Sequence, residues 1–234
     1  MKNALITGAT KGIGRAIAAA FASEGINLAI NSRNAAELAS LKTELLQINP
    51  AIKVFTAVAD GSNKEDLLFF ADGAADELGP INIVVNNLGL YQFSKIMGDE
   101  SDLFGKMVNT NLMPAYELYR FFGKSMVDAG EGHFFNICSV AALNPVVDAG
   151  LYSVTKAALL SLNNVMRIEM QDYGVKVTAV IPGSTLTASW DGQKVNKDTM
   201  VLPEDIASAV VNIYKMSKGA NVDQIIIKPA GGQL

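Results

Sequence analysis

The chain has 234 residues, of which 50% are hydrophobic and 18% charged, and it carries a formal net charge of −4. This acidic balance lacks the clustered basic face of a nucleic-acid-binding protein, so we expect no nucleic-acid partner. One cysteine and one histidine exclude a disulfide within the chain, and we expect no metal site.

Short segments rich in Val and Ile alternate with longer amphipathic segments along the whole chain. The short segments show little polar alternation, which is typical of parallel strands covered on both faces. The predicted strands are Ala4–Thr7, Asn27–Ile30, Lys53–Val58, Ile81–Asn86, His133–Ile137, Val175–Ile181 and Gln224–Lys228. The predicted helices are Gly14–Ser23, Ala35–Gln47, Asn63–Leu78, Leu112–Asp128, Leu151–Tyr173 and Pro203–Met216. This order predicts an α/β fold with a doubly wound sheet and right-handed crossovers.

One connection is longer and less regular than the others. Residues 184–202 carry Ser, Thr, Asp, Gly and Lys without helical or strand spacing, whereas ordinary connections in α/β units are much shorter. We therefore predict a substrate-binding loop or lid over residues 184–202, within a single domain that covers residues 1–234.

No segment resembles an export or membrane signal. The N-terminus enters an apolar strand at once, without the features of a signal peptide, and no apolar stretch reaches transmembrane length. Together with the single thiol, which suits a reducing compartment, this predicts a cytoplasmic protein without a membrane partner.

The first predicted strand leads into a glycine-rich turn, Thr7–Gly14, and a helix follows. The spacing is Gly-x-x-x-Gly-x-Gly, and no Lys-Ser/Thr pair follows the last glycine, which excludes a Walker loop. At such a junction, glycines let backbone N–H groups approach a pyrophosphate at the positive end of the helix. The alternative is a plain tight turn. The pattern predicts dinucleotide binding by Gly8, Thr10, Lys11, Gly12, Ile13 and Gly14.

The residues that follow the second strand indicate which dinucleotide is bound. NAD-binding units place an acidic residue there, but this chain reads Asn31-Ser32-Arg33-Asn34. Arg33 and Lys11 would instead face a 2′-phosphate, which a guanidinium binds well. The alternative is two solvated surface cations. The sequence favours NADP(H) as cofactor.

Tyr152 and Lys156 lie four residues apart at the start of a predicted helix, and therefore on one face. An ammonium about 4 Å from a phenol, at an effective dielectric of ~20, attracts the phenolate by roughly 4 kcal/mol. This attraction would lower the pKa of Tyr152 from ~10 toward ~7, near the range that general acid–base catalysis needs, and desolvation would oppose part of this shift. Ser139 follows the fifth strand, where ligands bind in open α/β sheets, and would hold a carbonyl oxygen. Taken singly, these residues also fit a surface pair and a turn cap.

The motifs together resemble the short-chain dehydrogenase/reductase family over essentially the whole chain. They stand in the family's order: Thr7–Gly14, Asn86-Asn87-Leu88-Gly89, Asn111, Ser139, Tyr152 with Lys156, and Pro182-Gly183. The resemblance implies a catalytic tetrad. Tyr152 would be the acid/base, and Ser139 would orient and polarise the substrate oxygen. Lys156 would bind the nicotinamide ribose and tune Tyr152, and Asn111 would hold a water for proton relay.

The resemblance also implies further cofactor contacts, a quaternary structure and a strand order. Asp60 would contact the adenine, and Asn87 with Gly89 would line the adenosine side. Pro182, Gly183, Thr185 and Thr187 would hold the nicotinamide carboxamide and the phosphates. The helices at Leu112–Asp128 and Leu151–Tyr173 would pack against a partner in a homodimer or homotetramer. The fold would be a single-domain Rossmann-type fold with helices on both faces of a seven-stranded parallel sheet, in the order 3-2-1-4-5-6-7.

Three positions depart from the family pattern. Leu88 replaces Ala, and Cys138 replaces Ser, where we expect a small buried side chain. The segment Asp223–Gly232 lacks the Val-Asp-Gly-Gly ending, which weakens an assignment to β-ketoacyl carrier-protein reductases. From Pro182 to Leu234 the chain is loosely similar to bacterial sepiapterin-reductase-like members.

These observations predict an NADP(H)-dependent oxidoreductase that interconverts a carbonyl and an alcohol. The substrate would be a 3-oxoacyl thioester, a pterin-type compound or another small ketone. The alternatives are a non-catalytic NADP(H) sensor, which typically loses the acid/base pair, and an epimerase or dehydratase, which usually has a longer C-terminal domain. We expect a structural role for His133. A last group of residues either walls a hydrophobic substrate pocket or packs within loops: Tyr91, Phe93, Leu143, Val146 and Trp190.

Overall fold

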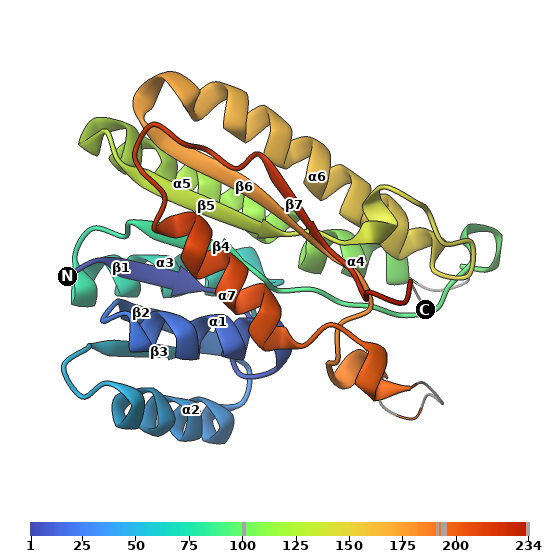
Figure 1. Cartoon of the computed structure of the whole chain (residues 1–234), viewed down its shortest axis with the longest axis horizontal. Helices are drawn as coiled ribbons and strands as arrows, with labels where there is room; N and C mark the ends of the chain where they lie inside the picture. The colour runs from blue at the N-terminus through green and yellow to red at the C-terminus, as the bar shows by residue number, and fades with distance from the viewer. Residues whose placement is uncertain (100–101, 191, 193–195, 233–234) are drawn as a thin grey trace.

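Seven parallel strands form one sheet in the computed structural model, which describes residues 1–99, 102–190, 192 and 196–232 (Figure 1). The strand order is β3-β2-β1-β4-β5-β6-β7, so the predicted order is confirmed. In the central pairings, Ala4–Ile6 of β1 lie beside residues 28–30 of β2 and residues 83–85 of β4. The strands are β1 (Asn3–Ile6), β2 (Asn27–Ser32), β3 (Val54–Val58), β4 (Ile83–Asn86), β5 (Gly132–Ile137), β6 (Val175–Pro182) and β7 (Gln224–Ile227).

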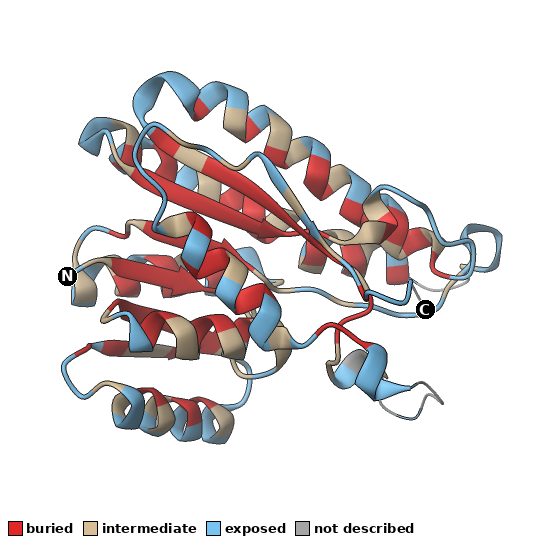
Figure 2. Cartoon of the chain, viewed as in Figure 1, coloured by how far each residue is buried: buried red, intermediate tan, exposed pale blue. Residues whose placement is uncertain are grey.

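Helices cover both faces of this sheet, as the sequence predicts (Figure 1). One face carries α1 (Gly12–Ser23), α2 (Ala35–Ile48) and α7 (Pro203–Tyr214). The other face carries α3 (Lys64–Leu78), α5 (Met113–Ala129) and α6 (Gly150–Met170). Figure 2 shows the inner strands buried between these layers, with the exposed residues on the outer sides of the helices and on the edge strand β7.

Alternate residues of the inner strands enter opposite hydrophobic cores, because successive side chains of a strand point to opposite faces. In β2, Leu28 and Ile30 belong to the core under α1, α2 and α7, whereas Ala29 belongs to the core under α3, α5 and α6. Both faces are therefore apolar, and this explains why the strands show no polar alternation in the sequence.

Helix starts follow local capping rules. The Asn34 side chain accepts hydrogen bonds from two backbone N–H groups of α2, and the Asn63 side chain caps α3 in the same way at Asp66. In α7, Pro203 occupies the first turn, and the Asp205 carboxylate accepts a hydrogen bond from the Leu202 N–H at 2.9 Å.

The helix α4 (Leu103–Asn111) lies in a region where the sequence pattern predicts none. It has nine residues and presents only Leu103 and Met107 as large buried apolar side chains, too few to produce a clear amphipathic period. Leu112, with φ −120° and ψ −53°, separates it from α5, which begins close to the predicted helix start. The break leaves Asn111 at the end of α4, facing α6, the helix that carries Tyr152 and Lys156.

Within the described part of the chain, no helix is long and apolar enough to cross a membrane. Across the same residues, no group of three or more His, Cys, Asp or Glu side chains is placed to hold a metal ion.

Candidate active site

The glycine-rich turn joins β1 to α1 in a conformation that requires glycine. Gly8 and Gly12 have φ values of 64° and 54°, in the left-handed region. Gly14 lies against the Gly8 carbonyl oxygen, and the Asn87 amide donates hydrogen bonds to the carbonyl oxygens of Thr7 and Gly8, both at 3.0 Å. Asn87, which we expected on the adenosine side of the cofactor, therefore holds the turn itself in shape.

We expect the Gly14→Ala variant to damage this turn. A Cβ at Gly14 would lie 2.6 Å from the Gly8 carbonyl oxygen and closer still to the Asn87 amide nitrogen. Because backbone cannot move aside cheaply, the substitution should lower the free energy of unfolding by about 1–3 kcal/mol and weaken NADPH binding. Urea denaturation and NADPH titration measure both effects. Gly219→Ala is the control, since a Cβ at Gly219 meets nothing within 4 Å; equal behaviour of the two variants would contradict the prediction.

The N-terminus of α1 fits the predicted pyrophosphate. Its N-cap residue, Lys11, makes no side-chain capping bond, and no acidic residue stands in the first turn. In α2 and α3, by contrast, an asparagine side chain caps the first turn and an acidic residue follows. The first N–H groups of α1 are thus left for an anionic ligand, and the glycines allow close approach.

The two cations expected at the 2′-phosphate each lie beside a carboxylate. Lys11 Nζ is 2.8 Å from Glu37 Oε1, and Arg33 is 3.8 Å from Asp60 Oδ2. Burial alone would raise the pKa of Asp60, but its hydrogen bonds with Ser62 and the charge of Arg33 outweigh burial and lower the pKa. Arg33, Lys11 and Thr10 all lie next to the end of β2, where Thr10 is hydrogen-bonded to Ser32 at 3.4 Å. Each of the two cations thus has a carboxylate partner at the position where the sequence predicts the 2′-phosphate.

Tyr152, Ser139 and Lys156 come together at the carboxyl ends of the strands. Ser139 follows β5 and caps the short 3₁₀ helix Val140–Ala142, with its side chain accepting a hydrogen bond from the Ala141 N–H. Its hydroxyl is close enough to the Tyr152 phenol to lower the pKa of that group. Lys156 is 3% exposed, and its Nζ lies 5.8 Å from the centre of the Tyr152 ring.

The pKa expected for Tyr152 is wrong for the folded chain without a ligand. Burial raises the pKa of Tyr152 to about 12, although the hydrogen bond with Ser139 acts to lower it. The Lys156 Nζ bonds the Ile137 carbonyl oxygen at 2.8 Å rather than the phenol, and its charge does not offset burial. Burial also lowers the pKa of Lys156 to about 8. The phenol is therefore held protonated, and the lysine titrates closer to neutrality than the tyrosine does.

Asn111 links the segment that follows β4 to α6 through its side chain. Its side-chain oxygen accepts a hydrogen bond from the Leu90 N–H at 2.6 Å, and its amide donates to Leu90 O and Thr155 Oγ1. A Cβ at Gly89 would lie 3.5 Å from Lys156 Nζ and 3.8 Å from Asn111 Oδ1, so Gly89 leaves space beside both groups. All four residues of the expected tetrad thus gather around one point.

The segment after β6 reaches back to the glycine-rich turn. The Gly183 N–H donates to Ile227 O, and Thr185 Oγ1 donates to Gly183 O at 3.0 Å. A Cβ at Gly12 would meet the Thr187 methyl group at 3.1 Å. Thr187 therefore lies beside the turn where the sequence predicts the phosphates. Of the predicted lid 184–202, residues 191 and 193–195 lie outside the described residues.

Two threonines that the sequence did not predict as site residues support the site. Thr7 Oγ1 accepts hydrogen bonds from the N–H groups of Asn87 and Leu88, both at 3.0 Å. Thr155 donates to the Tyr152 carbonyl oxygen and accepts from Asn111. Their positions inside the motifs could have indicated these roles, because Thr7 begins the glycine-rich turn after β1 and Thr155 directly precedes Lys156. Cys138 is buried as expected, and burial raises the pKa of its thiol to about 12.

Comparison with known proteins identifies the family. A family model described as short chain dehydrogenase matches residues 2–198, and the chain therefore belongs to this family of oxidoreductases. An uncharacterized oxidoreductase of Staphylococcus aureus (strain USA300) is 30% identical over 228 residues, covering 97% of each chain. Another, of Staphylococcus saprophyticus, is 28% identical over 233 residues with the same coverage.

Solved structures of the same fold include complexes with NADP or an NADP derivative. An alcohol dehydrogenase from the archaeon Thermococcus sibiricus, complexed with 5-hydroxy-NADP, has a TM-score of 0.90 and 28% identity. The match covers 100% of this chain and 99% of that one. A metagenomic short-chain oxidoreductase in complex with NADP has a TM-score of 0.86 and 26% identity, covering 98% and 97% of the two chains.

Proposed function

We propose that the protein is an NADP(H)-dependent carbonyl reductase or alcohol dehydrogenase acting on a small molecule. The observation that carries this proposal is the group of Ser139, Tyr152 and the buried Lys156 at the carboxyl ends of the strands. The NADP complexes of the similar structures support the choice of cofactor. A non-catalytic sensor would not need this group.

The residues of the site would divide the chemistry of carbonyl reduction between them. Bound NADP(H) supplies the hydride. A carbonyl oxygen that meets both the Ser139 hydroxyl and the Tyr152 phenol would be held by two donors at once, and this fixes the substrate in position. As negative charge develops on that oxygen, Tyr152 donates its proton and Ser139 donates a hydrogen bond. In the oxidation of an alcohol, the same two groups act in reverse.

Lys156 and Asn111 would restore the proton of Tyr152. In the structure the Lys156 ammonium bonds the Ile137 carbonyl oxygen. Once the phenol has lost its proton, the phenolate would attract this ammonium. The lowered pKa of Lys156, about 8, lets this group exchange protons with water at physiological pH. The space beside Gly89 would admit the water that the resemblance places near Asn111.

NADPH consumption against a panel of ketones, β-ketoacyl thioesters, quinones and pterins, with NADH alongside, tests the proposal. We expect at least one class of carbonyl compound to be reduced with NADPH. Failure of every class in both directions would reject the activity, and a clear preference for NADH would reject the cofactor.

The charges of Lys11 and Arg33 should decide the preference between the two cofactors. We expect Lys11→Ala and Arg33→Ala each to raise the Kd for NADPH about tenfold, a loss of about 1.4 kcal/mol, and to leave the Kd for NADH unchanged. Titration of both cofactors by fluorescence measures this. Lys124→Ala is the control, because this surface lysine pairs with Asp128 on α5. Equal losses for NADPH and NADH would show that the two cations do not contact a 2′-phosphate.

The proposal includes a homo-oligomer. The helices expected at the partner interface carry large apolar side chains on their outer sides, which a second copy would cover. On α5 these are Tyr116 and Phe121, and on α6 they are Val154, Val165 and Ile168.

A further inference from the structure

We propose that Tyr91 is a wall of the substrate site and selects carbonyl compounds with an aromatic ring next to the reacting carbon, an inference that rests on the proposed function. Tyr91 lies in the segment after β4, and its ring packs edge-to-face on Tyr152, with centroids 5.0 Å apart at 82°. Phe93 packs on Tyr91 in the same manner, at 5.3 Å and 73°. Three aromatic rings therefore run from the catalytic phenol toward solvent.

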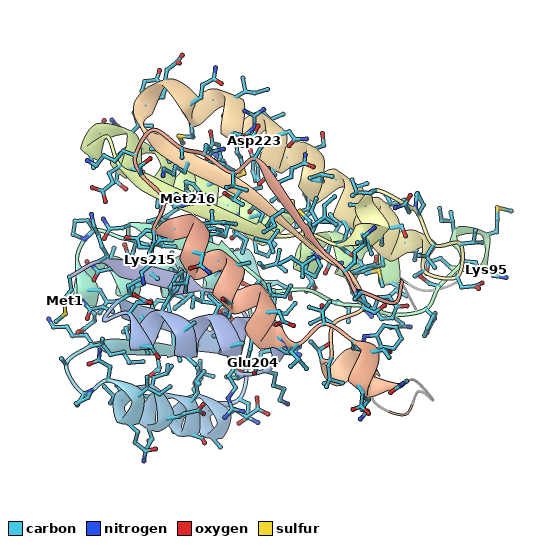
Figure 3. The ribbon with its side chains drawn as sticks, viewed as in Figure 1. Met1, Lys95, Glu204, Lys215, Met216 and Asp223 are labelled. Carbon is cyan, nitrogen blue, oxygen red and sulfur yellow. The ribbon has the colours of Figure 1, made fainter. Side chains whose placement is uncertain are left out.

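This row of rings is held in place by backbone hydrogen bonds. The Ser94 N–H donates to Asp148 O at 2.8 Å, and the Gly150 N–H donates to Ser94 O at 2.9 Å. Lys95 and Asp148 add an ion pair at 3.2 Å; Figure 3 labels Lys95. Because Gly150 begins α6, these bonds fix the segment that carries Tyr91 to the helix that carries Tyr152.

The surface around the row is apolar. Two segments, residues 91–97 and 143–147, meet at the start of α6, and their exposed large hydrophobic side chains form what we call the substrate rim. Exposed apolar groups are ordinary when they are scattered, but a cluster beside a catalytic group indicates binding. The rim consists of Phe93, Ile96, Met97, Leu143, Val146 and Val147.

The charges near the rim do not favour an anionic substrate. Lys95 is the only Lys or Arg in residues 87–99 and 139–150, and Asp148 neutralises it. A thioester carried on a phosphorylated arm or an acidic carrier protein would need cations here. A neutral ring fits better, since it would extend the edge-to-face row of Phe93, Tyr91 and Tyr152 at the spacing that aromatic rings prefer.

Reduction of two methyl ketones with NADPH tests the inference: acetophenone, which carries a ring, and 2-butanone, which does not. We expect wild-type kcat/KM to favour acetophenone at least tenfold. Tyr91→Ala should lower kcat/KM for acetophenone about 10- to 100-fold, mainly through KM, and lower that for 2-butanone much less, so that the preference for acetophenone is lost. Tyr91→Phe should restore the preference, because the ring and not the hydroxyl makes the contact. The Kd for NADPH should not change in either variant.

Tyr173→Ala is the matched control, since it removes an exposed tyrosine that follows the far end of α6. Equal use of the two ketones by wild type, or an equal loss of both in Tyr91→Ala, would overturn the inference and leave the proposed function standing. If neither these ketones nor any other carbonyl compound consumes NADPH, the proposed function itself fails.

Discussion

The Tyr152→Phe variant is expected to lose about a thousandfold of kcat while binding NADPH as tightly as wild type does. The phenol donates the proton that completes reduction, and general acid catalysis of this kind contributes about 10²- to 10⁴-fold. A thousandfold loss corresponds to about 4 kcal/mol of activation free energy. Phenylalanine keeps the ring and its edge-to-face contact with Tyr91, so the packing of the site should survive.

Steady-state kinetics with the best ketone and NADPH titration by fluorescence measure the two quantities separately. Tyr119→Phe is the matched control, because this tyrosine on α5 bonds Glu169 at 2.6 Å, outside the site described above. Retention of more than a tenth of wild-type kcat in Tyr152→Phe would exclude Tyr152 as the proton donor. A wild-type protein that binds NADPH but reduces nothing, and is indifferent to the substitution, would be the sensor.

The second large effect is a loss of stability in mild acid that depends on His133. This histidine is buried between β5 and β6, where it stacks on Phe135 and its Nε2 lies 2.9 Å from Thr178 Oγ1. Burial, with a smaller contribution from the charge of Lys176, lowers the pKa of His133 from 6.5 to about 3. The folded protein therefore holds the ring neutral across a range in which the unfolded chain binds a proton.

The sign of the effect follows from this difference in protons bound. Above pH 6.5 neither state protonates His133, and the stability is fully present. Between pH 6.5 and 3 only the unfolded state binds the proton, so stability falls as the pH falls. The expected loss is about 2 kcal/mol at pH 5 and about 4 kcal/mol near pH 3.

Urea denaturation at pH 7, 6 and 5 measures this slope. His133→Asn removes the titrating group and keeps a polar partner for Thr178, so its stability should depend much less on pH over the same interval. Glu37 and Glu131 have a pKa near 4.5 in the unfolded chain and a lower pKa in the folded protein. Their contribution to stability is therefore lost mainly below pH 5. Parallel slopes for wild type and the variant would show that His133 does not cause the loss.

The sequence by itself determined the sheet, its helical layers and the place of the site. Strands buried on both faces must be apolar along their whole length, and this periodicity can be read without coordinates. The glycine turn was equally legible, because only glycine adopts the positive φ of Gly8 and Gly12 at no steric cost. The four-residue spacing of Tyr152 and Lys156 placed both on one helix face.

Only the tertiary structure decided the electrostatics and the partners of these residues. The spacing of Tyr152 and Lys156 predicts that the ammonium acts on the phenol, whereas in the fold that ammonium bonds the Ile137 carbonyl oxygen and burial raises the pKa of the phenol. The fold also pairs Lys11 with Glu37 and places Tyr91 against Tyr152, which lies 61 residues away in the chain. Burial and contacts between distant segments set such properties, and neither is encoded in the local spacing of residues.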